Sequence, residues 1–196
     1  MRFSVFVGDI ADAPADALCT STNPRLSLMM GSGASIRRRG GPAVMRACEA
    51  LLAGRKTLPP GTAHPTTAGA LPNKVAIHCV ASDASHRSSE AIVRLCVASA
   101  LACAAAAGCA SVAMPIFGTG HARLRFADAA RAMARSAAET QAGVERMIFV
   151  TNDEENVPTL RAILERAAGH PIEIERSREV EPEDDSFWSD AYRVEA

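Results

Sequence analysis

The chain has 196 residues, 48% of them hydrophobic and 22% charged, which suits one globular domain with a sizeable core. Its 21 basic and 22 acidic residues give a formal net charge of -1, a balance that argues against nucleic acid and against an anionic membrane as partners. The apolar N-terminal stretch is too short for a signal peptide and the six cysteines form no C-x-x-C motif, so we expect a cytoplasmic protein with reduced, buried thiols.

Strands and helices are expected to alternate along the chain. In chain order we expect a strand at 2–8, a short apolar run at 16–20, a helix at 34–52 interrupted at Gly40-Gly41-Pro42, an edge strand at 62–68, a strand at 75–80, a helix at 88–108, a strand at 111–117, a helix at 126–142, a strand at 146–151, a helix at 157–168 and a last edge strand at 171–175. Because the central strands are apolar throughout, this order predicts a three-layer α/β fold. We expect one domain over 1–175, followed by an acidic tail over 176–196.

Four loops of unusual composition each follow a predicted strand. They cover residues 8–10, 20–33, 118–120 and 152–153. In α/β sheets, ligands bind in crevices at the carboxyl ends of the strands. The four loops are therefore expected to share one crevice.

Two of these loops are rich in glycine. Gly31-Ser32-Gly33-Ala34 precedes a helix, and Gly118-Thr119-Gly120 ends a strand. Small residues let backbone N–H groups approach an anion closely, so the two loops can grip a pyrophosphate from both sides. The alternative for the first loop is a plain flexible start of a helix. Neither loop matches a Walker A or a G-x-G-x-x-G motif.

Two polar residues at strand ends have two interpretations each. Asp9 can accept a hydrogen bond from an exocyclic amine such as that of adenine, or it can cap a short helix over 10–14. Asn23 can bind a ribose hydroxyl, or it can serve as a turn residue before Pro24.

The histidines and a basic triplet give weaker signals. His121 is a candidate catalytic residue, although no partner is evident near it in the sequence, and His78 lies in an apolar strand as a core residue. No H-E-x-x-H motif or Cys/His array is present, so we expect neither a metal nor a cofactor. The consecutive arginines 37–39 fan around a helix and form no single stripe for nucleic acid.

The ordered set of loops resembles a macro domain, the ADP-ribose-binding module. The resemblance covers about residues 3–168 and lies in the segments Gly8-Asp9-Ile10, ADALCTSTNP (15–24), GSGASI (31–36), LPNKVAIHCVA (71–81) and MPIFGTG (114–120). It implies a mixed, mostly parallel sheet of six or seven strands between helix layers, with ADP-ribose, alone or attached to a protein or metabolite, as the partner.

The same resemblance assigns roles to individual residues. Asp9 would bind the adenine amine, Asn23 the distal ribose, and the two glycine loops the diphosphate. Asn152 would lie near the adenine or its ribose. The whole implied ligand-binding set is Asp9, Ile10, Thr20, Asn23, Gly31, Ser32, Gly33, Ala34, Phe117, Gly118, Thr119, Gly120, His121 and Asn152.

Three departures from the family pattern bear on catalysis. Thr20 stands at the first Asn of the family motif, Gly33 stands where glycohydrolases of the MacroD type carry an Asp, and Ala122 stands where an aromatic residue often follows. The usual carboxylate that activates water is therefore missing, and only His121 and Asn23 remain as catalytic candidates. The sequence leaves open an ADP-ribose hydrolase, a reader without turnover, and a site for another nucleotide or RNA end.

Overall fold

The computed structural model describes residues 1–177, so most of the acidic tail expected over 176–196 lies outside the described residues. The described elements are β1 (Arg2–Val7), the 3-10 helix η1 (Ile10–Asp12), β2 (Ala17–Thr22), α1 (Gly31–Gly40), α2 (Pro42–Leu52), β3 (Ala63–Thr66), β4 (Val75–Val80), α3 (Glu90–Ala106), β5 (Ser111–Pro115), α4 (Phe126–Glu139), β6 (Arg146–Thr151), the 3-10 helix η2 (Glu154–Asn156), α5 (Val157–Ala168) and β7 (Glu173–Arg176). No described helix is long and apolar enough to cross a membrane.

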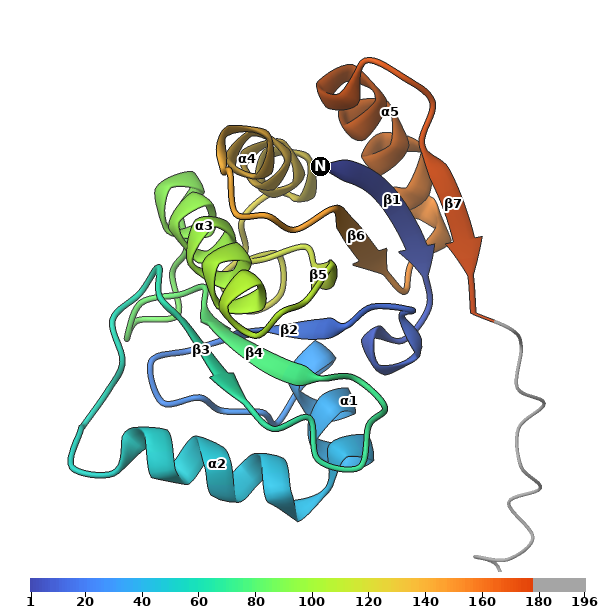
Figure 1. Cartoon of the computed structure of the whole chain (residues 1–196). Coiled ribbons are helices and arrows are strands. Elements are labelled where there is room, and N and C mark those ends of the chain that lie inside the picture. The colour runs from blue at the N-terminus through green and yellow to red at the C-terminus, as the bar shows by residue number, and fades with distance from the viewer. Residues whose placement is uncertain (178–196) are drawn as a thin grey trace, which may run out of the picture.

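The strands form one sheet of seven in the order β3-β4-β2-β5-β6-β1-β7 (Figure 1). Every pairing is parallel except that of β3 with β4, which is antiparallel. The predicted mixed, mostly parallel sheet of six or seven strands is confirmed. The parallel strands from β4 to β1 all present their carboxyl ends at one edge of the sheet.

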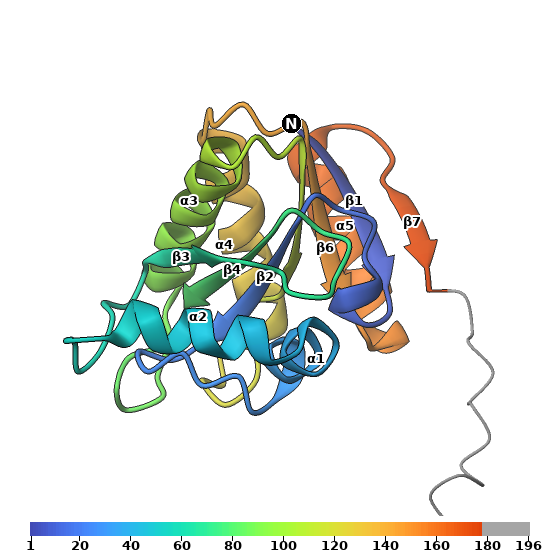
Figure 2. The same cartoon turned by 60° about the horizontal axis from the view of Figure 1, so that its bottom comes forward.

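Helices cover both faces of the sheet and enclose a separate apolar layer on each. Helices α3, α4 and α5 cover one face, where Leu101, Met133 and Leu160 pack with the rings of Phe3 and Phe149. Helices α1 and α2 cover the other face, as Figure 2 shows from a second direction, and bury a cluster around Ile36 and Val44. The predicted three-layer architecture is therefore confirmed.

The predicted helix over 34–52 is two helices, and it begins earlier than expected. Gly31 is already the first residue of α1, and Gly41, with a φ of +74°, separates α1 from Pro42 at the start of α2. A Cβ on Gly69 would lie 1.9 Å from the carbonyl oxygen of Gly40, so only glycine lets the 68–70 loop approach this junction so closely. The predicted interruption at Gly40-Gly41-Pro42 is confirmed, and only the predicted start at residue 34 was wrong, because glycine at the start of a helix is typical of a loop in the sequence.

Other differences concern boundaries. The strand expected at 111–117 ends at Pro115, and the apolar run at 16–20 continues as strand through Thr22. The helices expected at 88–108 and 126–142 are shorter, at Glu90–Ala106 and Phe126–Glu139. All six cysteines are free, as expected, and five of them are buried.

Candidate functional site

The unusual loops meet around one cavity of about 850 Å³ at the carboxyl edge of the sheet. Its lining residues follow β1, β6, β5, β2 and β4, which are consecutive neighbours in the sheet. Four strand spacings separate β1 from β4, so the cavity extends for about 19 Å across the strand ends. Figure 2 shows the loops after β2, β4 and β5 gathered at the lower edge of the molecule. The expectation of one shared crevice is confirmed.

Asp9 marks the end of the cavity beside β1. Its Oδ1 accepts a hydrogen bond of 2.9 Å from the N–H of Ala11, which caps η1, and a second one from the Ser35 hydroxyl. Its Oδ2 lies 3.6 Å from the guanidinium of Arg38. Asp9 is therefore a helix cap, as one interpretation predicted, and Oδ2 is still able to accept a hydrogen bond from a ligand.

The N-terminus of α1 faces the middle of the cavity. Met30 occupies the capping position, and its side chain makes no capping hydrogen bond. The first backbone hydrogen bond of the helix runs from the amide of Ala34 to the carbonyl oxygen of Met30, at 3.2 Å. The preceding N–H groups of the first turn thus have no helical partner, and Gly31 and Ser32 line the cavity. This is the geometry in which helix N-termini bind anions.

The loop after β5 lines the same cavity as the N-terminus of α1 and offers further N–H groups. Within the described residues, the amides of Thr119, Gly120 and His121 donate to no other protein group. The Thr119 hydroxyl donates to the carbonyl of Ile116 at 2.9 Å, so this hydrogen bond stabilises the loop. Gly118 has a φ of +78°, and a Cβ there would lie 2.8 Å from the Ser88 hydroxyl oxygen, so this position requires glycine.

Asn23 holds the loop after β2. Its Oδ1 accepts hydrogen bonds from the amides of Arg25 at 3.0 Å and Ser27 at 3.3 Å, which confirms the interpretation as a turn residue. The Nδ2 group makes no hydrogen bond to another described residue, and Asn23 lines the cavity. A role toward a ligand therefore stays a prediction.

Most of the expected site residues share this cavity, and three do not. Those that line it are Asp9, Ile10, Asn23, Gly31, Ser32, Ala34, Gly118, Thr119, Gly120, His121 and Asn152. Thr20 is buried against Nδ1 of His78, at 3.2 Å, and Gly33 packs against Leu28. Phe117 is fully buried, and its N–H donates to the Met133 sulfur at 3.3 Å. These three residues have no surface in the cavity.

Several lining residues were not found from the sequence, His86 above all. It follows β4, and its ring centroid lies 6.5 Å from that of His121. Met29 and Met30 form an exposed apolar rim, and Arg38 adds a cation beside Asp9. Because these residues come from separate loops, only the strand order brings them together.

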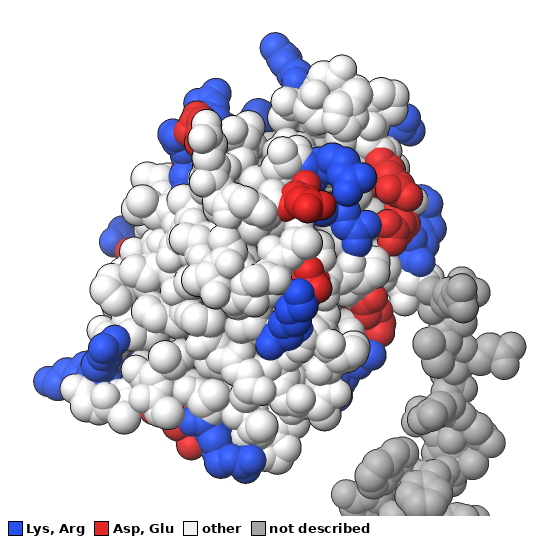
Figure 3. Space-filling view, viewed as in Figure 1, with Lys and Arg blue, Asp and Glu red and all other residues white. Residues whose placement is uncertain are grey.

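The charges around the cavity are few. Asp9 is the only carboxylate among the described lining residues, and it follows β1. His86 follows β4, at the other end of this row of strands, and His121 follows β5, in its middle. In the described part of the chain, no group of three His, Cys, Asp or Glu residues is placed to hold a metal. On the face shown in Figure 3, basic and acidic residues lie interspersed, so no surface of one sign is apparent there.

Comparisons with known proteins agree with this geometry. The sequence model of the family described as Macro domain matches residues 19–133. A macro domain-containing protein of Streptomyces nogalater is 38% identical over 151 residues, which cover 74% of this chain and 82% of the relative. A protein of Citrobacter rodentium named O-acetyl-ADP-ribose deacetylase is 32% identical over 171 residues, which cover 83% of this chain and 95% of that relative.

Solved structures share the fold at lower identity. An Oceanobacillus iheyensis macrodomain mutant with ADPR superimposes with a TM-score of 0.76 and 21% identity, covering 84% of this chain and 92% of that chain. A Trypanosoma brucei macrodomain in complex with ADP-ribose gives a TM-score of 0.70 at 21% identity, covering 81% of this chain and 67% of that chain. At this identity the likeness concerns the arrangement of the chain.

Proposed function

The chain belongs to the macro domain family, and on that premise we propose that its cavity binds ADP-ribose, free or attached to a protein or metabolite. The observation that carries the proposal is a pair of segments with unpaired N–H groups that line the same cavity. One is the uncapped N-terminus of α1, and the other is the run of unpaired amides at 119–121. A diphosphate between them would receive hydrogen bonds from both sides.

The two ends of the cavity differ in a way that fits the two ends of ADP-ribose. Beside β1, Oδ2 of Asp9 would accept from the exocyclic amine of adenine. Asn152 would lie near the adenosine moiety. Beside β2, Asn23 would meet the distal ribose. The relatives support the identity of the ligand, since solved macrodomains with 21% identity carry ADPR or ADP-ribose.

We also propose that the protein hydrolyses an ester of the distal ribose. Cleavage of a glycosidic bond passes through a cation-like transition state that carboxylates stabilise, and no carboxylate lines the described cavity at that end. Ester hydrolysis instead develops negative charge on the carbonyl oxygen, which N–H donors stabilise. The name of the Citrobacter rodentium relative, O-acetyl-ADP-ribose deacetylase, supports the same chemistry. The six free cysteines support a reducing, cytoplasmic location.

Calorimetry with ADP-ribose tests the binding proposal, and Gly120→Glu is the informative variant. No atom lies within 4 Å of a Cβ built on Gly120, so the variant should fold. Its carboxylate would repel a diphosphate held by the neighbouring amides, so we expect ADP-ribose affinity to fall at least about 100-fold. Gln141→Glu, which adds the same charge at an exposed site after α4, should leave the affinity unchanged.

Two outcomes would contradict the proposal. One is a wild-type protein that binds no ADP-ribose at millimolar concentration. The other is a folded Gly120→Glu variant that keeps its affinity. Incubation of the wild type with O-acetyl-ADP-ribose then separates an enzyme from a reader, because a reader would bind this ester and leave it intact.

A further inference from the structure

The rings of His86 and His121 approach each other at the rim of the cavity. Their centroids are 6.5 Å apart and their planes are inclined by 57°. Both side chains line the cavity and both residues are exposed. The described hydrogen bonds include none between the two rings, so their nitrogens remain able to exchange protons with a bound ligand.

Short loops hold His86 in place. The Asp83 carboxylate accepts hydrogen bonds of 2.8 Å from the amides of Ser85 and Arg87, and the amide of Asp83 donates to the Arg87 carbonyl at 2.8 Å. His86 itself adopts a φ of +57°, which is uncommon for a residue with a Cβ. The loop is thus closed on itself and presents the imidazole at its tip.

Hydrogen bonds within the loop of His121 also hold that loop in place, and the loop contacts that of His86. Its backbone closes through hydrogen bonds of 3.0 Å from Arg123 to Gly120 and from Leu124 to Gly118. The two loops meet where Gly118 passes over the Ser88 hydroxyl, which has no hydrogen-bond partner in the described structure. The two histidine loops are thus in contact at their bases.

Strand order places His86 at the end of the cavity remote from Asp9, and the ring contact brings the side chain of His121 to the same end. Asp9 follows β1, whereas His86 follows β4, at the other end of the row of strands that lines the cavity. If adenine lies at Asp9 and the diphosphate lies at α1, the second ribose reaches the two histidines. This step rests on the proposed function.

We propose that His86 and His121 form the general acid and base pair for ester hydrolysis on the distal ribose. One neutral imidazole removes a proton from water while the water oxygen bonds to the ester carbonyl carbon. The tetrahedral intermediate then collapses and breaks the bond between that carbon and the ribose oxygen. The other imidazole, protonated, donates its proton to this oxygen, so the products are a carboxylic acid and ADP-ribose with a free hydroxyl.

The resemblance implies that Gly33 stands where related glycohydrolases carry a catalytic Asp, and the histidine pair would supply catalytic groups in place of that carboxylate. General acid and base catalysis contributes about 100-fold to 10,000-fold in rate. Two imidazoles supply both proton transfers without a carboxylate. They also need no metal.

The test compares His86→Gln, His121→Gln and the double variant with the wild type, using the full chain. Release of acetate from O-acetyl-ADP-ribose gives kcat and KM, and calorimetry gives the affinity for ADP-ribose. We expect each single variant to lose at least about 100-fold in kcat and to keep its ADP-ribose affinity within about threefold. The double variant should lose little more than either single one, because the two groups act as a unit.

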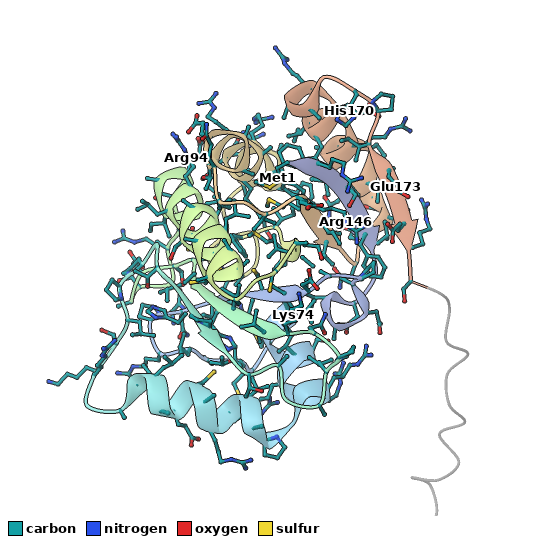
Figure 4. All side chains as sticks on the ribbon, in the orientation of Figure 1. Met1, Lys74, Arg94, Arg146, His170 and Glu173 are labelled. Atoms are coloured by element: carbon teal, nitrogen blue, oxygen red, sulfur yellow. The ribbon has the colours of Figure 1, made fainter. Side chains whose placement is uncertain are left out.

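His170→Gln is the matched control. Figure 4 shows His170 beside α5 and β7, away from the loops that line the cavity, and its Nδ1 contacts only the carbonyl of Pro171 among the described polar groups. This variant should keep both kcat and affinity. Full kcat in His86→Gln or His121→Gln would overturn the proposal.

The outcomes separate this proposal from the proposed binding function. Wild-type protein that binds ADP-ribose yet leaves the ester intact overturns the histidine pair and preserves binding. An absence of ADP-ribose binding contradicts the proposed function directly, since calorimetry requires no turnover. Cleavage of a glycosidic ADP-ribosyl-serine peptide with the same dependence on both histidines would overturn the assignment to an ester.

Discussion

Asp9 divides its two carboxylate oxygens between the protein and the cavity. Oδ1 accepts from the Ala11 amide and the Ser35 hydroxyl, whereas Oδ2 has Arg38 as its polar partner among the described residues. In Asp9→Asn, the side-chain carbonyl oxygen can still accept hydrogen bonds from Ala11 and Ser35. The amide NH2 group that replaces Oδ2 cannot accept a hydrogen bond from adenine. We expect ADP-ribose affinity to fall at least about tenfold in calorimetry, with a change in the free energy of unfolding below about 1 kcal/mol.

Asp12→Asn provides the comparison for this residue. Asp12 also lies in η1 and pairs with an arginine of α1, Arg39, but it does not line the main cavity. The affinity of the Asp12→Asn variant for ADP-ribose should match that of the wild type. An equal loss in both variants would assign the effect to η1 as a whole rather than to the Oδ2 atom of Asp9.

Some residues of the candidate site could be predicted from the sequence, and others could not. Gly118, Gly120 and Asn23 lie just beyond predicted strands, so their place at the strand ends could be predicted. Thr20 could not be assigned correctly to a face, because side chains alternate along a strand and its direction depends on register. In the structure Thr20 turns toward His78 beneath α2. His86 was missed because its neighbour His121 lies on a different loop, brought near only by the sheet.

At the scale of elements, β4 is joined to its neighbours by a buried polar cluster around His78. Nδ1 lies 3.2 Å from the Thr20 hydroxyl on β2, and Nε2 lies 2.8 Å from the Thr66 hydroxyl on β3. The Cys48 sulfur on α2 lies 3.5 Å from Nε2. Burial, and next the charge of His64, lowers the pKa of His78 to about 4. The folded protein therefore holds this imidazole neutral.

This cluster predicts a dependence of stability on pH. The unfolded chain binds a proton at His78 below its ordinary pKa of about 6.5, whereas the folded chain resists it until about pH 4, so stability falls as pH decreases through this window. We expect the free energy of unfolding, measured in urea, to fall by about 3 kcal/mol between pH 7 and pH 4 on account of this group. His78→Gln should flatten the dependence, and His170→Gln should not. An unchanged profile in His78→Gln would contradict the assignment.

The elements themselves were largely predictable, and the exceptions share one cause. The strands β4 and β6 were predicted at their observed bounds because apolar residues make up most of each segment. The break between α1 and α2 was predicted at Gly40-Gly41-Pro42 and is confirmed, whereas the start of α1 was misjudged because Gly31 is a helix residue there. The need for glycine at position 40 depends on the close approach of the 68–70 loop, which comes from a distant part of the chain.

At the scale of the whole molecule, the cavity connects five neighbouring strand ends, so a ligand that fills it should stabilise the entire domain. A ligand bound only by the folded state, at a concentration of 100 times its Kd, stabilises it by about 2.7 kcal/mol. For a domain of this size, that corresponds to an increase in Tm of about 5 to 10 °C. We expect ADP-ribose to raise the Tm by this amount in the wild type and in Gln141→Glu, and not in Gly120→Glu.

Fragments of the ligand show whether both ends of the cavity contribute. AMP would occupy the end beside β1, β6 and β5, whereas ribose 5-phosphate would reach only the part near β5, β2 and β4. At equal free concentrations, each fragment should therefore raise the Tm less than ADP-ribose does, because each forms only part of the contacts. An equal shift with AMP would mean that the distal end contributes no binding energy, and it would contradict the placement of the second ribose beside Asn23 and the two histidines.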